Sequence, residues 1–236
     1  LKSMLYLIGL GVNVDGISKF GMEIVKKCKR VYLENYTVDF PYSVEELQVV
    51  IDKKLIPADR EFVESCRIID EARKMDVALL VYGSPLTATT HITLIQEAKA
   101  CNVKYKIIYN ASILDGVAET GLQLYKFGKI TSIPNFEAES FIEIVRDNQK
   151  IDAHSLILVD ICLDFERALA KLESTAKENK IKLNKIIVCS RLGTKDKKIF
   201  YRKIEDLKKK EITAPFCFII PGKLHFVEEE ILEEFS

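Results

Sequence analysis

Short apolar runs alternate with segments of helical periodicity along this 236-residue chain, and this alternation constrains the fold more than any other feature. The apolar runs occupy residues 5–8, 31–33, 77–82, 106–109, 155–161, 184–189 and 216–220. Strands that alternate with helices form βα units around a parallel sheet. We therefore expect an α/β fold whose sheet is mostly parallel.

The segments between these runs carry apolar residues that recur at helical spacing. One such face comprises Ile17, Phe20, Ile24, Val25 and Cys28; a second comprises Phe62, Cys66 and Ile69; a third comprises Ala168, Leu169, Leu172 and Ala176; and a fourth comprises Phe200, Ile204 and Leu207. Helices with one apolar face bury that face against a sheet. We expect these residues to lie in the core.

The alternation is interrupted between Gly121 and Ile133. A chain of this length, with 48% apolar residues, is long enough to form two compact domains. We expect an N-terminal α/β domain at residues 1–120 and a C-terminal α/β domain at residues 121–236.

Charge and cysteine content limit the compartment and the partners. Thirty-five Lys and Arg residues balance 35 Asp and Glu residues, so the overall charge favours neither nucleic acid nor a membrane as a partner. The six cysteines lack the short spacing of zinc and redox motifs (Cys28, Cys66, Cys101, Cys162, Cys189 and Cys217), which is typical of buried thiols in a reducing compartment. The chain has neither a run of membrane-spanning length nor a secretory pattern at its beginning. We expect a cytoplasmic protein.

Small and polar residues follow three of the predicted strands in the first half. These segments are Gly9-Leu10-Gly11-Val12, Gly83-Ser84-Pro85-Leu86-Thr87 with Thr89, Thr90 and His91, and Asn110-Ala111-Ser112-Ile113. The carboxyl ends of parallel strands meet at one edge of the sheet, where open α/β sheets bind ligands. The hydroxyl groups can orient a polar ligand or cap the helix that begins near His91. We therefore expect a small-molecule pocket at this edge.

The second half repeats the pattern. Its three predicted strands run into 158–160, 189–193 and 220–225. We expect these loops to close a cleft between the two lobes.

Several familiar sites are absent from the sequence. Val14 stands where the dinucleotide fingerprint requires its third glycine, and no Walker lysine follows. The three histidines, His91, His154 and His225, do not have the spacing of a metal site. No serine or cysteine has the surroundings of a catalytic nucleophile, and no residue is identified as a general base. The remaining chemistry is the alignment of a reactive cofactor with an acceptor.

Several segments, taken together, resemble the diphthine synthases. They are Met4–Gly11, Arg30–Glu34, Ala58–Arg60, Gly83–Pro85 with Ala88–His91, Asn110–Ile113, Gly121–Gly128 and Pro221–His225. The glycine pair Gly9 and Gly11 is shared with the wider tetrapyrrole-methylase-like group. The diphthine synthases usually carry Asp at the position of Ser84.

The resemblance implies an S-adenosylmethionine-dependent methyltransferase with two α/β domains of tetrapyrrole-methylase type and the cofactor cleft between them. It implies a homodimer whose substrate is a modified histidine of elongation factor 2, methylated on the amino group of its 3-amino-3-carboxypropyl arm. The carboxylate is a further methylation site in eukaryotic members, and the cofactor product is S-adenosylhomocysteine. Matched by motif, the cofactor contacts are Val12, Ser84, Thr87, Ser112, Ile113, Val159, Leu192 and His225.

Three other functions remain open from the sequence. One is a methyltransferase of the same fold that acts on a tetrapyrrole or another small molecule. Another is a non-catalytic protein that keeps the fold and binds elongation factor 2 or an adenosine-containing ligand. A nicotinamide dehydrogenase is the least favoured, because of Val14.

Overall fold

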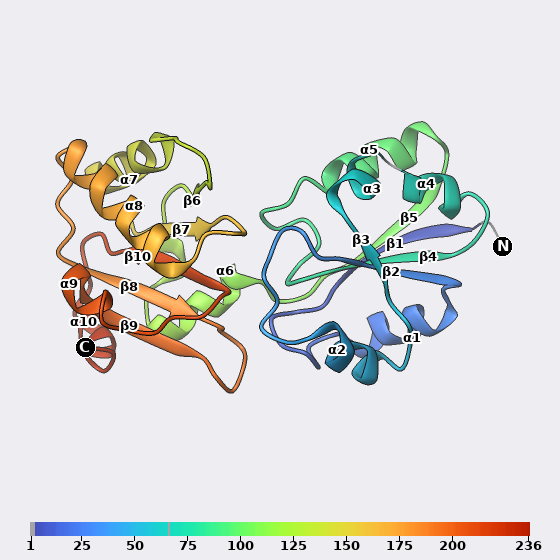
Figure 1. The fold of residues 1–236 in the computed structure, drawn as a ribbon, viewed down its shortest axis with the longest axis horizontal. Coiled ribbons are helices and arrows are strands. Elements are labelled where there is room, and N and C mark those ends of the chain that lie inside the picture. Colours follow the sequence, from blue (N-terminus) through green and yellow to red (C-terminus); the bar gives the residue numbers. More distant parts are fainter. Residues whose placement is uncertain (1–2, 66) are drawn as a thin grey trace. The chain divides into compact units, whose positions relative to one another are not determined.

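The computed structural model describes residues 3–65 and 67–236. The chain forms two compact units, Leu1–Asp115 (unit 1) and Gly116–Ser236 (unit 2), and each unit contains a five-stranded sheet (Figure 1). Cys66, which was placed on a predicted helical face, lies outside the described residues.

Unit 1 contains a fully parallel sheet in the order β3-β2-β4-β1-β5. Its strands are β1 (Met4–Gly9), β2 (Arg30–Glu34), β3 (Ile56–Ala58), β4 (Val77–Val81) and β5 (Lys104–Ile108). The helices that accompany them are α1 (Lys19–Lys27), α2 (Val44–Ile51), α3 (Arg60–Glu64), α4 (Arg67–Ala72), α5 (Ile92–Ala100) and α6 (Ile113–Gly116).

Helices cover both faces of this sheet. Figure 1 shows α3, α4 and α5 on one face and α1 and α2 on the other. The central strand β4 has five buried residues in a row, as expected for a parallel strand that is covered on both sides. Leu79 faces one apolar cluster and Leu80 the other, because side chains alternate along a strand.

Unit 2 contains a mixed sheet in the order β6-β7-β10-β8-β9. Its strands are β6 (Thr131–Ile133), β7 (Ser155–Val159), β8 (Lys185–Ser190), β9 (Lys198–Lys203) and β10 (Phe216–Ile220). Its helices are α7 (Ser140–Lys150), α8 (Phe165–Glu178), α9 (Ile204–Leu207) and α10 (Phe226–Glu233), with short 3₁₀ turns η1 (Val117–Thr120) and η2 (Leu124–Lys126).

All seven predicted strands are present, but the expectation of a mostly parallel sheet is wrong for unit 2. Only β6 and β7 pair in parallel there, and the other three pairings are antiparallel. An apolar run identifies a strand without giving its direction, which depends on the length and path of the connection before it. The sequence therefore predicted the elements of unit 2 but not their orientation.

Two residues of the predicted helical faces are placed differently by the structure. Phe200 belongs to the edge strand β9, not to a helix, and α9 begins only at Ile204. Phe20 lies on α1 but is 47% exposed, and the ammonium group of Lys106 lies 4.5 Å from its ring centre. All four members of the third face, on α8, are buried as predicted.

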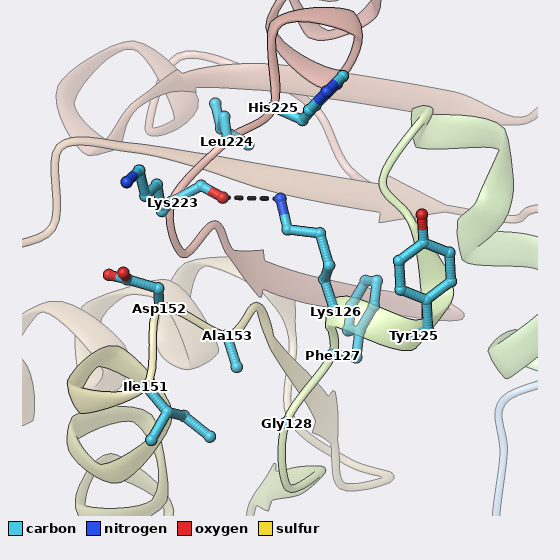
Figure 2. Close-up of a pocket in the computed structure, with 10 residues that line it drawn as sticks. All are labelled: Tyr125, Lys126, Phe127, Gly128, Ile151, Asp152, Ala153, Lys223, Leu224 and His225. Atoms are coloured by element: carbon cyan, nitrogen blue, oxygen red, sulfur yellow. Dashed lines mark hydrogen bonds between the residues drawn. The ribbon is translucent and has the colours of Figure 1, made fainter.

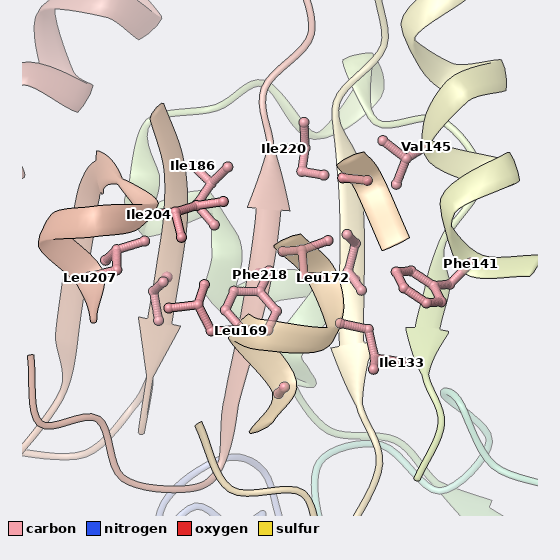
Figure 3. Close-up of a cluster of buried hydrophobic side chains, with 14 of the residues drawn as sticks. Ile133, Phe141, Val145, Leu169, Leu172, Ile186, Ile204, Leu207, Phe218 and Ile220 are labelled. Atoms are coloured by element: carbon pink, nitrogen blue, oxygen red, sulfur yellow. The ribbon is translucent and has the colours of Figure 1, made fainter. Parts of the chain in front are cut away.

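The core of unit 2 centres on Phe218 of β10, which is completely buried (Figure 3). Leu169 and Leu172 of α8 belong to the same cluster and lie near its ring in Figure 3. The ring of Phe165 also packs against Phe218, with 5.9 Å between ring centres. This packing holds α8 against the sheet. No helix among the described residues is long and apolar enough to span a membrane.

We predict that Phe218→Ala destabilises the protein by about 3–5 kcal/mol, because the neighbouring side chains cannot collapse fully into the cavity. Urea unfolding followed by circular dichroism measures the change. Phe136→Ala is the matched control, since Phe136 is 65% exposed and its loss is expected to cost less than about 0.5 kcal/mol. Equal costs for the two variants would contradict this description of the core.

Candidate functional site

The carboxyl edge of the unit 1 sheet brings together the three loops that the sequence singled out. Strand β1 pairs with β4 on one side and with β5 on the other. The loops that begin at Gly9, Gly83 and Asn110 therefore leave neighbouring strands at the same edge. This confirms the predicted convergence in the first half of the chain.

Backbone hydrogen bonds join two of these loops directly. The N–H of Gly11 donates to the carbonyl of Gly83 at 3.1 Å, and the N–H of Gly83 donates to the carbonyl of Gly11 at 2.9 Å. Both residues have positive φ angles, +74° and +69°, which glycine adopts without strain. A Cβ on Gly9 would lie 2.6 Å from the Gly83 carbonyl oxygen. The close approach of the loops therefore depends on these glycines.

Asn110 ties the third loop to the first. Its side-chain amide donates to the carbonyls of Gly9 at 3.0 Å and Gly16 at 2.9 Å, while its side-chain oxygen accepts from the N–H of Ala111. The asparagine thus uses both its donors and its acceptor to fix the path of the backbone. Asn110 is a positioning residue of this edge.

Five of the eight predicted cofactor contacts lie on these loops. Val12 follows the Gly11 bridge, and its carbonyl accepts a hydrogen bond from the hydroxyl of Tyr82 at 3.0 Å. Ser84 and Thr87 form a turn in which the Thr87 N–H donates to the Ser84 carbonyl. Both of these side chains are half-buried. The turn and the glycine loop therefore offer polar groups beside the same pair of strand ends.

Ser112 and Ile113 stand at the start of α6. The backbone N–H of Ser112 donates to the carboxylate of Asp115 at 2.7 Å, and its hydroxyl donates to the same oxygen at 3.1 Å. Ser112 is 5% exposed. A Cβ on Gly83 would lie 3.5 Å from the Ser112 Cα, so the second and third loops are in close contact.

His91 forms a hydrogen bond with a backbone group of the Ser84–Thr87 turn. Burial lowers the pKa of its imidazole, against the effect of its hydrogen bond with Pro85, so the ring is neutral at physiological pH. The Nδ1–H donates to the carbonyl of Pro85 at 3.0 Å, and Nε2 accepts from the hydroxyl of Tyr36 at 3.4 Å. The ring links the loop after β4 to the segment after β2.

The three predicted contacts of unit 2 do not leave the sheet at one edge. Val159 ends β7, and Leu192 follows the end of β8. Strand β10 runs antiparallel to both, with Ile220 opposite Ser155, the first residue of β7. The segment that leads to His225 thus starts at the opposite edge. The three loops of unit 2 therefore do not share one edge as those of unit 1 do, because β10 is reversed.

His225 instead borders a pocket of about 490 Å³ within unit 2 (Figure 2). The other lining residues come from the segments after η1, after α7 and after β10: Tyr125, Lys126, Phe127, Gly128, Ile151, Asp152, Ala153, Lys223 and Leu224. Figure 2 shows the ammonium group of Lys126 directed at the carbonyl of Lys223, 2.7 Å away.

A buried carboxylate holds the walls of this pocket together. Glu228 of α10 is fully buried and accepts hydrogen bonds from the N–H groups of Gln123 at 2.9 Å and His225 at 2.7 Å. It also contacts the Lys126 ammonium and His154 Nε2. Burial by itself raises the pKa of Glu228, but these hydrogen bonds outweigh it and lower the pKa to about 2.

The structure adds a residue for which the sequence gave no role. Glu34, the last residue of β2, is 1% exposed, and a buried carboxyl at a strand end is unusual because ionising it there is costly. Burial raises the pKa of its carboxyl to about 7, against the hydrogen bonds of Thr37 and Tyr36 and the charge of Arg60. The only sequence signal was an acidic residue at the end of an apolar run.

The comparisons with known proteins define the class of this protein. The profile of the Tetrapyrrole (Corrin/Porphyrin) Methylases matches residues 4–208. Together with the relatives described next, this match makes the protein a methyltransferase.

Individual relatives narrow the family. The chain is 37% identical to a diphthine synthase of Methanococcus maripaludis, with 98% of each chain covered. It is 32% identical to the diphthine methyl ester synthase of Schizosaccharomyces pombe, covering 99% of this chain and 94% of the relative. A crystal structure of a diphthine synthase superimposes with a TM-score of 0.92 at 32% identity, covering 99% of this chain and 96% of that one. The chain belongs to the diphthine synthase family.

We predict that Glu228→Gln destabilises the protein by about 3 kcal/mol at pH 7, the equivalent of its lowered pKa. A carboxylate with a lowered pKa stabilises the fold above about pH 4.5 and loses this contribution as the pH falls toward 2. The gap between wild type and variant should therefore narrow from pH 4.5 downward. Urea unfolding at pH 7 and pH 3 measures it, with the exposed neighbour in Glu229→Gln as the control. A gap that stays constant with pH would refute the assignment.

Proposed function

We propose that this protein uses S-adenosylmethionine to methylate the modified histidine of elongation factor 2 in diphthamide biosynthesis. The observation that carries the proposal is the near-complete coverage of relatives that are named as diphthine synthases. The amino group of the histidine's side-chain arm is the proposed acceptor. Whether its carboxylate is also esterified is decided by the mass of the product.

The edge of unit 1 suits an adenosyl sulfonium compound. The glycines at positions 9, 11 and 83 lack side chains where the loops meet, so the three loops pack closely against one another and bring their polar groups together. We propose that Val12, Ser84, Thr87, Ser112 and Ile113 hold it through backbone groups and hydroxyls. Val159, Leu192 and His225 of unit 2 remain proposed contacts on the strength of the sequence resemblance.

When bound, the sulfonium supplies an electrophilic methyl group. The contribution of the protein is to orient donor and acceptor, since well-aligned reactants gain up to roughly 7–11 kcal/mol. The hydrogen bonds of Asn110 and of the Gly11–Gly83 bridge fix the loops before the ligand arrives. This pre-organisation reduces the ordering cost of binding. We further propose that the protein is cytoplasmic, as its cysteine content indicates, and a homodimer, as the resemblance to the diphthine synthases implies.

The direct test is transfer of a labelled methyl group from S-adenosylmethionine to elongation factor 2 that bears the unmethylated intermediate. We expect label on the factor and an added mass on its modified histidine. Elongation factor 2 without the intermediate is the control and should remain unlabelled. Label on a tetrapyrrole instead of the factor would favour a small-molecule methyltransferase, the substrate class in the name of the matching family profile.

We predict that Ser84→Asp tightens the binding of S-adenosylmethionine about tenfold, because a carboxylate forms stronger hydrogen bonds with a cationic ligand than a hydroxyl does. Calorimetry of the purified variant measures the change. Ser84→Asn has a side chain of similar shape without the charge, and its affinity should stay within about threefold of the wild type. Equal affinities for the Asp and Asn variants would show that charge at this position is irrelevant.

A further inference from the structure

Residues 34–42, which begin with the last residue of β2, carry two buried oxygens that lack a hydrogen-bond partner within the described part of the chain. They are Oε1 of Glu34 and the hydroxyl of Tyr42. Buried polar atoms without a partner are rare in folded proteins. Two of them lie within nine residues, so the fold leaves two buried acceptors of this stretch free to bond another group.

This segment, Asn35–Ser43, lies at the carboxyl edge of the unit 1 sheet. Tyr36 packs against the apolar cluster on one face, and Phe40 and Tyr42 pack against the cluster on the other. The segment therefore passes over the edge from face to face. The segment crosses the edge beside β4, because Leu33 of β2 pairs with Leu80 of β4. Strand β4 leads into the Gly83 loop.

Contacts at both ends of the segment connect it to the proposed cofactor loops. At the first end, the Tyr36 hydroxyl donates to His91, which in turn donates to the Pro85 carbonyl. At the other end, the Tyr42 ring lies 6.4 Å from the ring of Tyr82, whose hydroxyl bonds the Val12 carbonyl. A ligand beside Val12 and Ser84 is thus adjacent to this segment.

We propose that Glu34 is the acid–base residue of methyl transfer, and that its Oε1 accepts a proton from the ammonium group of the acceptor. The inference rests on the proposed function. Glu34 is buried, so the proposal requires the neighbouring chain to move before the acceptor can reach Oε1; the adjoining segment Asn35–Ser43 contains neither helix nor strand. Only one of the two carboxyl oxygens is engaged by a side chain, since Oε2 accepts from the Thr37 hydroxyl at 3.0 Å.

Proton transfer to Glu34 comes first, and methyl transfer follows. Glu34 takes one N–H proton and becomes a neutral carboxylic acid, which leaves an amine with a free electron pair. That pair forms the N–C bond to the methyl group of the sulfonium donor, while the C–S bond breaks and its electrons remain on sulfur as a thioether. The nitrogen regains a positive charge, and Glu34 releases its proton to solvent.

The surroundings of Glu34 suit a base that works near neutral pH. Burial raises the pKa of its carboxyl to about 7, close to the value at which general bases are most effective. Arg60 of α3 and Tyr36 act on Glu34 directly. Tyr36 in turn faces Asp59 and Glu64 on or beside α3 and neutral His91 before α5. Of these, Arg60 opposes the effect of burial by favouring the carboxylate.

The test compares wild type, Glu34→Gln and Glu34→Asp in single-turnover methyl transfer from pH 5.5 to 9. We expect the wild-type rate to rise with an apparent pKa near 7. Glu34→Gln should be about 10²–10⁴-fold slower, the usual range for loss of a general base. Its rate should keep rising to pH 9 without a plateau above 7, because the acceptor must then lose its proton to solvent, while Glu34→Asp restores part of the rate and the plateau. Glu71→Gln is the matched control, because Glu71 binds Arg30 and Tyr32 away from the proposed loops, and it should behave as wild type.

Two readouts independent of turnover separate this role from a structural one. A carboxyl whose pKa is raised in the folded state destabilises the fold as pH rises from about 4.5 to 7. Thermal unfolding of the wild type should show this loss, and Glu34→Gln should not. Affinity for S-adenosylhomocysteine, measured by calorimetry, should be the same in both proteins.

Each outcome decides between the two proposals. Transfer by the wild type with equal rate and pH profile in Glu34→Gln overturns the role of Glu34 and leaves the proposed function intact. If Glu34→Gln does not fold, Glu34→Asp decides, since an Asp variant with wild-type rate at every pH also overturns the role. A wild type that transfers no methyl group to properly modified elongation factor 2 removes the proposed function, and this inference with it.

Discussion

The close approach of three neighbouring strand ends in unit 1 is the constraint on which the proposed site depends. Gly11 and Gly83 exchange two backbone hydrogen bonds, and Asn110 bonds the carbonyls of Gly9 and Gly16. These contacts leave no room for a side chain at Gly9. They hold the loops in place with backbone groups, so the side chains of Val12, Ser84 and Thr87 are not needed for loop structure.

The order of the parallel strands explains why we propose the chemistry at this edge. Strands β4, β1 and β5 are adjacent although they are separated along the chain, and each ends in small or polar residues. Strand β2 adds Glu34 beside them on the other side of β4. A fold that gathers four loops at one edge can combine ligand binding with a proton acceptor without a metal ligand or a covalent nucleophile. Orientation and proton removal are the contributions that such an edge can make.

The sequence predicted the positions of the strands better than it predicted their direction and the edge of the sheet at which each strand ends. Apolar runs marked seven strands, but β3, β6 and β9 were missed. Two of these have only three residues, and β9 has lysines at both ends and half-buried residues between them. Its Phe200 shares helical spacing with Ile204 and Leu207, so periodicity favoured a helix. The reversal of β10 has no local signal, because direction is set by how the chain returns to the sheet.

The sequence indicated the parts of the proposed site that glycines and strand ends form. It did not indicate the parts that depend on which residues become buried in the folded chain. Gly9, Gly11 and Gly83 stand out in the sequence because each follows an apolar run. The position of His225 depends on the direction of β10, and the environment of Glu34 depends on residues from α3 and from the loop before α5. Burial and a missing hydrogen-bond partner are properties of the folded chain, so the sequence gave no reason to assign Glu34 a role in proton transfer.

The central claim is that the carboxyl edge of the unit 1 sheet binds the methyl donor. Amide hydrogen exchange with and without saturating S-adenosylhomocysteine tests this claim directly, because it reports on each loop separately. The account predicts slower exchange at residues 9–12, 83–87 and 110–113 when the ligand is bound. Bound ligand with unchanged exchange in all three loops would contradict it.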